Sequence, residues 1–352
     1  MRPIHILVDS FADEGLTNAQ MINAREIVRR LDAERFHVTM FVQDRTEPGI
    51  SSRPHTRLLH LPRRLKTPVI LREFLFGPQD ILFYLKASPA SRWYLNLRAL
   101  RADRCALVAT IESQSDWRDE TIPPRVRRLF EQTILRSDHL FSNSPLVKRS
   151  LQSNYGLTSE IVRTGVDTEF FTPNYDRPPN PRPRVLFVGA LRIFKGPHLV
   201  LAAAQLFPQA DFMLVGDGVL RQELQERSRS LGNVAISGAL GRNALRQQFA
   251  QADIFLFPSH WEGSPRVLME AAACGLPVIA RKDYEPETVV DGVTGFLVGS
   301  DDEMMTRLGQ LLADSHLQRR MGKCGREHMA AFSWDLITRQ WETIFARLAR
   351  KQ

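Results

Sequence analysis

The sequence predicts an α/β protein built from two doubly wound domains. Short apolar runs alternate with longer amphipathic ones, a proline-rich break interrupts this alternation, and a second alternating series follows. Strand–helix alternation is typical of parallel sheets covered by helices. A chain of 352 residues also has room for two domains.

The first series begins close to the N-terminus. Residues 4–8 are an apolar run that predicts a buried strand, and residues 15–31 have the apolar spacing of a helix. Further strands are predicted at residues 38–42, 106–111 and 139–142. These elements indicate a parallel sheet in an N-terminal domain at residues 1–178.

A linker and a second series follow. Residues 177–183 contain four prolines, and proline fixes φ and lacks an amide donor, so this stretch predicts a linker. The C-terminal domain is predicted at residues 179–333, with strands at residues 185–188, 212–215, 234–236, 254–257, 277–280 and 295–298.

The chain is predicted to end in a helix. Apolar residues recur at helical spacing in residues 334–352, and we expect this helix to pack back on the N-terminal domain. Ligands of doubly wound sheets bind outside the carboxyl ends of the strands, so we expect an active site in a cleft between two facing domains.

The composition is that of a soluble globular protein. Hydrophobic residues make up 43% and charged residues 24% of the chain, which excludes disorder, collagen and coiled coil as descriptions of the whole. Cys105, Cys274 and Cys324 have no metal-site spacing and favour a reducing compartment. With no apparent signal peptide or membrane span, we expect a cytoplasmic location, with peripheral attachment to the inner face of the membrane.

The positive charge is concentrated in one segment. The chain carries a net charge of +8, and residues 53–104 hold eleven basic and three acidic residues, which accounts for all of it. Basic residues interleaved with aromatic ones suit an anionic membrane or a lipid-linked substrate. A solvated helix face over an apolar core explains the segment equally well, and nucleic acid is not expected as a partner.

The strongest chemical signal lies at residues 258–280. Glu262 and Glu270 stand eight residues apart, where a predicted strand ends at Pro258 and a helix opens near Pro265. A helix N-terminus favours phosphate. From spacing alone, a helix cap and a surface glutamate explain the pattern equally well.

The whole string resembles the donor-binding motif of glycosyltransferase family 4, retaining sugar transferases of the GT-B fold with two Rossmann-like domains. Further matching segments occur in the family's order at residues 164–173, 188–196, 214–221, 236–240 and 287–298. The resemblance covers most of residues 140–300.

The resemblance implies transfer of a sugar from a nucleotide-sugar donor to a glycan or lipid-linked hydroxyl, with retention of anomeric configuration and without a cofactor. It places Glu262 against the transferred sugar, Lys195 at the diphosphate with Arg192 as a further catalytic group, and Glu270 at the ribose. The implied donor-binding residues are Glu270, Gly263, Ser264, Pro265, Arg266, Val267, Leu268 and Leu240.

The sequence departs from the family at several positions. Ala190 stands where the family has an arginine, and Arg192 is the candidate substitute. Glu112 stands at the place of an acceptor-side histidine, and Gly15 is the one glycine of the first loop that is implied on that side. Residues 282–286 lack the family's two glycines, which predicts different local donor contacts.

No metal site is predicted, because no Asp-x-Asp follows a strand and no histidine pair has ligand spacing. Two alternative functions stay open. One is another enzyme of the same fold, such as a sugar-nucleotide epimerase, and the other is a non-catalytic partner at a membrane surface.

Overall fold

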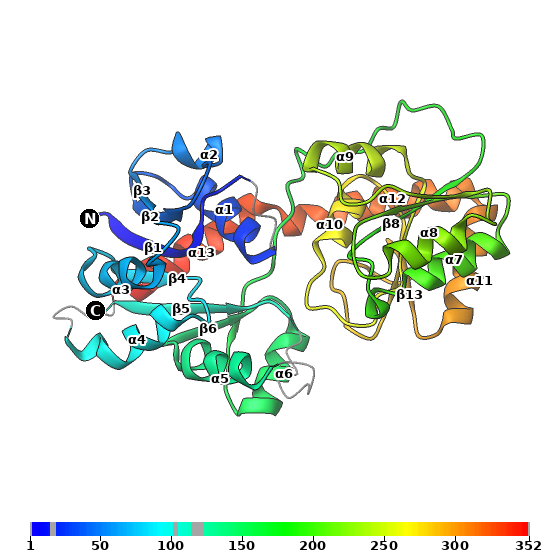
Figure 1. The fold of residues 1–352 in the computed structure, drawn as a ribbon. Coiled ribbons are helices and arrows are strands. Elements are labelled where there is room, and N and C mark those ends of the chain that lie inside the picture. Colours follow the sequence, from blue (N-terminus) through cyan, green and yellow to red (C-terminus); the bar gives the residue numbers. More distant parts are fainter. Residues whose placement is uncertain (1, 15–18, 101–104, 114–122, 351–352) are drawn as a thin grey trace. The chain divides into compact units, whose positions relative to one another are not determined.

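The computed structural model describes residues 2–14, 19–100, 105–113 and 123–350. The chain divides into two compact units, which are described separately (Figure 1). Unit 1 comprises Met1–Thr164 and Trp334–Gln352, and unit 2 comprises Gly165–Ser333.

In its described residues, unit 1 forms a seven-stranded sheet in the order β3-β2-β1-β4-β5-β6-β7. All neighbouring strands are parallel. The strands are β1 (Ile4–Phe11), β2 (Phe36–Val42), β3 (Thr56–His60), β4 (Ile81–Phe83), β5 (Ala106–Ile111), β6 (His139–Ser142) and β7 (Glu160–Ile161). The central strands are almost wholly apolar because helices cover both of their faces.

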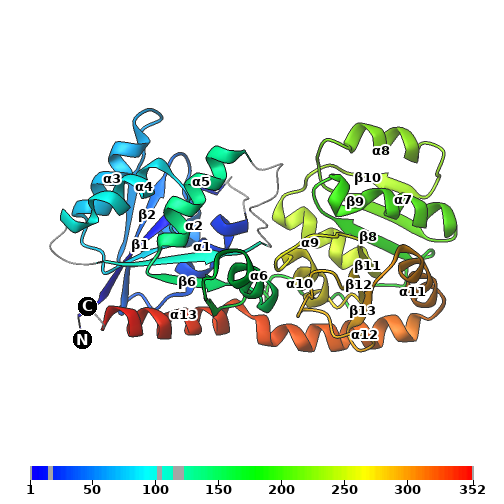
Figure 2. The ribbon, with the colours of Figure 1, turned by 90° about the horizontal axis from the view of Figure 1, so that it is seen from below.

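The helices of unit 1 form two layers. They are α1 (Ala19–Arg30), α2 (Pro48–Ser51), α3 (Lys66–Phe76), α4 (Pro89–Leu97), α5 (Pro124–Thr133), α6 (Pro145–Tyr155) and α13 (Trp334–Ala349), with short 3₁₀ turns at Arg98–Leu100 and Ile134–Arg136. Ser88 and Ser144 cap α4 and α6 by accepting backbone N–H groups. Buried residues of α1 and α13 pack on one face of the sheet, and those of α3, α4, α5 and α6 pack on the other (Figure 2).

Helix α13 belongs to unit 1 through an apolar stripe. Trp341 and Phe345 contact the Phe83 ring of β4, with ring centroids 4.7 and 4.9 Å apart. Trp334, at the start of the helix, is also buried in this core. The packing of this stripe ties the C-terminal helix to the first sheet.

Unit 2, all of whose residues are described, contains a six-stranded parallel sheet in the order β10-β9-β8-β11-β12-β13. Its strands are β8 (Arg184–Val188), β9 (Asp211–Val215), β10 (Val234–Ile236), β11 (Ile254–Phe257), β12 (Val278–Arg281) and β13 (Gly295–Val298). Its helices are α7 (Pro197–Leu206), α8 (Arg221–Ser228), α9 (Arg242–Gln251), α10 (Arg266–Ala273), α11 (Asp301–Ala313) and α12 (Ser315–His328), with 3₁₀ turns at Ile193–Lys195 and Met329–Phe332. The prediction of two doubly wound α/β domains is confirmed by the two sheets.

The boundary between the units lies earlier than residue 178. Residues 165–178, which the sequence assigned to the first domain, cluster with unit 2. Arg326 of α12 donates to the carbonyl oxygens of Thr168 and Phe171 at 2.8 and 2.9 Å. These bonds hold the segment on unit 2, whereas the proline pattern marks only the turn that follows it.

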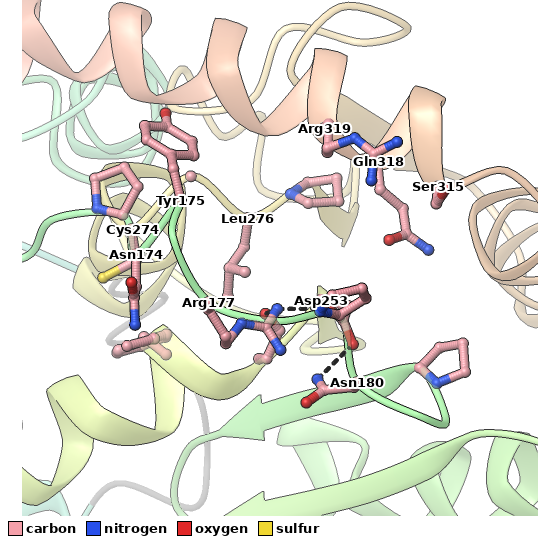
Figure 3. Close-up of a pocket in the computed structure, with 18 of the residues that line it drawn as sticks. Asn174, Tyr175, Arg177, Asn180, Asp253, Cys274, Leu276, Ser315, Gln318 and Arg319 are labelled. Carbon is pink, nitrogen blue, oxygen red and sulfur yellow. Dashed lines mark hydrogen bonds and ion pairs between the residues drawn. The ribbon is translucent and has the colours of Figure 1, made fainter.

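The proline-rich linker is also fixed to unit 2. Arg177 and Asn180 both bond to the Asp253 carboxylate, at 2.6 and 2.8 Å (Figure 3). These residues line a cavity of about 280 Å³ at the amino ends of the strands. The bonds of Arg177 and Asn180 to Asp253 thus hold the linker on unit 2.

Among the described helices, none is both long and apolar enough to cross a membrane.

Candidate active site

The strand order of unit 2 reverses between β8 and β11, because β9 and β10 lie beyond β8, and β12 and β13 lie beyond β11. Doubly wound sheets bind ligands at such a switch point, outside the carboxyl ends of the strands. The loops that follow β8 and β11 carry Lys195 and Glu262, respectively.

The loop after β8 is packed tightly against the loop after β9. Leu191 N–H donates to the carbonyl oxygen of Asp217 at 2.9 Å. A Cβ atom at Gly216, which has φ +148°, would lie 1.8 Å from the carbonyl oxygen of Gly189. Only glycine allows these two backbones to approach so closely, and this approach fixes the start of the loop that leads to Lys195.

The structure brings Lys195 and Glu262 together as an ion pair between Nζ and Oε1. Ser259 Oγ donates to the same Oε1 at 2.7 Å. The side chains of Lys195 and Glu262 are only 17% and 13% exposed, so the pair is largely shielded from water. Sequence reasoning missed Ser259, although it is polar and lies just beyond β11 at the predicted ligand edge.

The segment between Glu262 and α10 is compact. Gly263 and Pro265 are buried, and Ser264, Arg266 and Val267 are half-buried. Leu268 N–H donates to the Pro265 carbonyl oxygen at 3.2 Å. An anion at this helix N-terminus would therefore share that N–H with Pro265.

Glu270 lies in the second turn of α10 and is 6% exposed. Arg266, one turn earlier, donates to its Oε1 at 3.3 Å. Burial, and secondly the charge of Glu270, raises the pKa of the nearby Cys274 thiol to about 12. The thiol is therefore neutral at physiological pH.

The loop after β12, at residues 282–286, contains a buried tyrosine and no glycine. Tyr284 is fully buried, and its hydroxyl has no hydrogen-bond partner among the described residues. Burial, with the charge of Glu262 as a further cause, raises the pKa of this hydroxyl well above its ordinary value. Arg281 Nε donates to the Pro258 carbonyl oxygen at 3.3 Å, which joins this loop to the loop that carries Glu262.

Two predicted donor-side residues lie outside this ion pair. Leu240 follows β10 and is half-buried, beyond a turn at Gly238 whose carbonyl oxygen accepts the Gly216 N–H at 2.9 Å. Arg192 is exposed, and within the described part of the chain its guanidinium makes no hydrogen bond or ion pair. The structure therefore does not bond Arg192 to the Lys195–Glu262 pair.

Glu112 in unit 1 is held by polar neighbours. Asn23 Nδ2 donates to Oε2 at 2.9 Å, and Tyr84 Oη donates to Oε1 at 2.8 Å. Asn143 Nδ2 donates to the Glu112 carbonyl oxygen at 3.0 Å. Sequence reasoning missed these three residues. Asn143, like Glu112, directly follows a predicted strand, and that position could have marked it as a candidate. Asn23 in α1, and Tyr84 after β4, which the sequence did not predict, have no such signal.

Tyr84 has the unusual backbone angle φ +59° for a bulky residue. Such strain is tolerated where surrounding packing fixes it, and it clusters at functional sites. The Tyr84 ring packs edge-on against Phe83 with centroids 4.4 Å apart. This conformation directs the hydroxyl toward Glu112.

The strand order of unit 1 reverses between β1 and β4. Asp9 in β1 accepts the Lys86 N–H at 2.9 Å. Burial raises the pKa of Asp9 and lowers the pKa of Lys86, and their opposite charges counter both shifts. Gly15, the other predicted acceptor-side residue, lies outside the described residues.

In the portion of the chain that the structure describes, no group of three or more His, Cys, Asp or Glu side chains is arranged to hold a metal ion.

Comparison with known families matches both halves of the chain. Residues 153–328 match the family "Glycosyl transferases group 1", and residues 23–170 match "Glycosyltransferase Family 4".

Curated relatives carry related names. The D-inositol 3-phosphate glycosyltransferase of Corynebacterium diphtheriae is 30% identical over 69% of this chain and 64% of its own length. The GDP-mannose-dependent alpha-(1-6)-phosphatidylinositol monomannoside mannosyltransferase of Mycolicibacterium smegmatis is 35% identical over 54% of this chain and 55% of its own length. The matched region thus spans less than two thirds of each of these relatives.

Solved structures show the same fold. The sucrose-phosphate synthase of Thermosynechococcus elongatus superposes with a TM-score of 0.82 at 22% identity, over all of both chains. Anabaena HepE in complex with UDP and glucose gives a TM-score of 0.76 at 18% identity, over 97% of this chain and 99% of HepE. The chain therefore belongs to glycosyltransferase family 4 and has its two-domain GT-B fold.

Proposed function

We propose that this protein transfers a sugar from a nucleotide-sugar donor to a hydroxyl acceptor with retention of anomeric configuration. One observation above all supports this function, which is the half-buried Lys195–Glu262 pair at the switch point of unit 2. Glu270 on the adjacent helix α10 supplies a second carboxylate, which is buried. Solved relatives of the same fold include HepE in complexes with UDP and with UDP-glucose.

On the donor side, Lys195 would bind the diphosphate and offset the negative charge that develops on it as it leaves. Glu262 would accept hydroxyl groups of the transferred sugar, and Glu270 those of the ribose. The amides at the start of α10 would add to the binding of the diphosphate.

Retention follows if the acceptor attacks from the side of the leaving group. The bond between the anomeric carbon and the phosphate oxygen breaks, and a bond to the acceptor oxygen forms on the same face. The acceptor's proton passes to the departing phosphate. No covalent glycosyl-enzyme is needed. The protein mainly stabilises the charge on the departing diphosphate and orients the donor and the acceptor.

On the acceptor side, we propose that Glu112, oriented by Asn23 and Tyr84, binds the hydroxyl that is glycosylated. The names of two relatives specify inositol 3-phosphate and a phosphatidylinositol mannoside as their substrates. The second of these names, and the basic segment of unit 1, support a lipid-linked acceptor at the inner face of the cytoplasmic membrane.

A product screen tests this function. The protein is incubated with radiolabelled UDP-, GDP- and ADP-sugars and with glycan or lipid acceptors. We expect one donor to give nucleoside diphosphate and a labelled acceptor, whose anomeric configuration is read by NMR. Conversion of the donor sugar without transfer would instead fit an epimerase.

Two variants localise the activity. Lys195→Ala and Glu262→Ala are each expected to abolish transfer while the circular dichroism spectrum keeps its native form. Turnover at the wild-type rate in either variant would contradict the assignment.

A further inference from the structure

One exposed face of unit 1 combines unpaired positive charge with exposed apolar side chains. It is formed by α3, α4 and α5, which pack side by side on the same face of the sheet. We call it the α3–α5 face.

The structure sorts the basic residues of residues 53–104 into two groups. Arg53 is buried and donates to three backbone carbonyl oxygens, while Arg57 and Arg98 pair with Glu73 and Asp138 at 2.8 and 2.9 Å. Lys66 donates to a side-chain amide oxygen, and Lys86 lies over the Phe11 ring. Arg101 and Arg104 lie outside the described residues.

The arginines of the second group make no hydrogen bond or ion pair with the described residues. They are exposed, and two arginines of α5 share these properties. These residues are Arg63, Arg64, Arg72, Arg92, Arg125 and Arg128. Among the described acidic residues of the α3–α5 face, Glu131 is the exposed one without an ion pair. Six arginines against one glutamate make this face strongly cationic.

Large apolar side chains stand out of the same face. Leu65, immediately before α3, is 75% exposed, Phe76 at the end of α3 is 80% exposed, and Trp93 on α4 is 50% exposed. Other apolar residues of this segment, such as Phe74 and Tyr94, are buried in the core. The exposed three are therefore not part of the packing of their own unit.

Leu65 is both exposed and in a strained backbone conformation. It has φ +64°, a left-handed conformation that a leucine adopts only at a cost. Its side chain gains no burial in return, and it stands between Arg64 and Lys66. The strain and the exposure are both accounted for if Leu65 enters an apolar environment outside the protein.

We propose that the α3–α5 face docks on an anionic phospholipid bilayer, with Leu65, Phe76 and Trp93 entering the headgroup region and the free arginines binding lipid phosphates. Apolar insertion and basic attraction are the two signals that a peripheral protein needs together for stable attachment. A nucleic acid would use the charge, but not an isolated leucine beside it. This inference deepens the proposed function, from which it takes the lipid-linked acceptor.

Vesicle flotation with the full chain tests the docking and needs no enzymatic activity. The wild-type protein is expected to float with vesicles of phosphatidylcholine and phosphatidylserine, to stay behind with phosphatidylcholine alone, and to be released by high salt. Each arginine near an anionic surface contributes about fivefold to partitioning. The triple variant Arg63→Gln, Arg64→Gln, Arg92→Gln should therefore bind about 100-fold more weakly.

Matched variants separate docking from folding and from bulk charge. Arg229→Gln, Arg319→Gln, Arg320→Gln removes the same charge from exposed positions of unit 2 and should bind as the wild type does. Leu65→Asn should melt no lower than the wild type, because asparagine tolerates left-handed φ, yet it should bind vesicles several-fold more weakly. Sugar transfer to a water-soluble acceptor should be unchanged in all of these variants.

Three results would overturn the docking proposal. The first is failure of the wild-type protein to float with the anionic vesicles. The second is vesicle binding by the Arg63, Arg64, Arg92 variant that equals wild-type binding. The third is a loss of vesicle binding in the unit 2 control as large as the loss in that variant. Binding of single-stranded RNA that depends on the same arginines, without vesicle binding, would assign this face to nucleic acid instead. Vesicle binding without any sugar transfer would leave the docking intact and refute only the proposed function.

Discussion

The ion pair between Lys195 and Glu262 makes a counter-intuitive prediction, because a donor diphosphate must compete with Glu262 for the Lys195 ammonium. Glu262→Gln removes the competing charge. We therefore expect this variant to bind nucleoside diphosphates more tightly than the wild type, although it transfers sugar more slowly.

The size of the effect follows from the burial of the pair. With side chains 17% and 13% exposed, the pair is better shielded than a surface salt bridge. A hydrogen bond to a charged group contributes about 1.5–3 kcal/mol, and the neutral amide that replaces it still contributes about 1 kcal/mol. The net release is about 1 kcal/mol, which lowers the Kd of a nucleoside diphosphate about fivefold.

Isothermal titration with UDP and with GDP measures this change. Both ligands lack the sugar, so the loss of the contact between Glu262 and the sugar does not enter. Glu169→Gln is the charge control, since Glu169 is an exposed carboxylate of unit 2 that has no partner in the described part of the chain. It should leave the Kd unchanged.

A double-variant cycle isolates the pair. Lys195→Met should weaken the binding of nucleoside diphosphate at least tenfold, by loss of a charge-assisted contact. In the Lys195→Met background, Glu262→Gln should no longer tighten binding. An unchanged or higher Kd in Glu262→Gln alone would refute competition for Lys195.

Three further predictions follow from unit 2. Glu270→Gln should raise the Kd of UDP or GDP about 10- to 100-fold, through weaker hydrogen bonds to the ribose, with a small change in melting temperature; an unchanged Kd would remove Glu270 from the site. Gly216→Ala should lower the free energy of unfolding by about 3 kcal/mol, because its Cβ would lie 1.8 Å from a backbone oxygen. Gly232→Ala, with open space around the new Cβ, should be neutral in urea unfolding. The Cys274 thiol has its pKa raised by burial from 9.0 to about 12, so the unfolded chain loses this proton first and stability should fall as pH rises through that interval, by about 4 kcal/mol in total. Urea unfolding against pH checks this slope, which Cys274→Ala should flatten.

Most of the sheet structure could be predicted because buried parallel strands are continuous apolar runs. The predicted strands at residues 106–111, 139–142, 234–236, 254–257 and 295–298 coincide with β5, β6, β10, β11 and β13. Strands β3, β4 and β7 were missed. β4 and β7 have three and two residues, which are too few to show a hydrophobic pattern. β3 is an edge strand with exposed positions, so its sequence is not a continuous apolar run.

The candidate site was predictable where chemistry is tied to one string of residues. The sequence from Glu262 to Glu270 predicts a loop followed by a helix N-terminus. The structure places Glu262 against Lys195, which is 67 residues away in sequence. The contacts of Glu112 could not be predicted, because Asn23, Tyr84 and Asn143 come from three separate elements that only the sheet order brings together. The strained φ of Tyr84 likewise has no signature in the sequence.

The charged segment shows a limit of a different kind. Its sequence fits a packed helical layer and a membrane-binding surface equally well, and the structure places some of its apolar residues in the core and others on the surface. Phe74 and Tyr94 are core residues, while Phe76 and Trp93, close to them in sequence, are exposed. Only the three-dimensional packing separates the two groups.

The central claim is that unit 2 binds the donor between Lys195 and Glu270 at the carboxyl edge of its sheet. A crystal structure with a bound nucleoside diphosphate tests it most directly. We predict the diphosphate on Lys195, which has then left Glu262, and the ribose hydroxyls on Glu270. A nucleotide bound elsewhere, or one bound while Lys195 still pairs with Glu262, would contradict the claim.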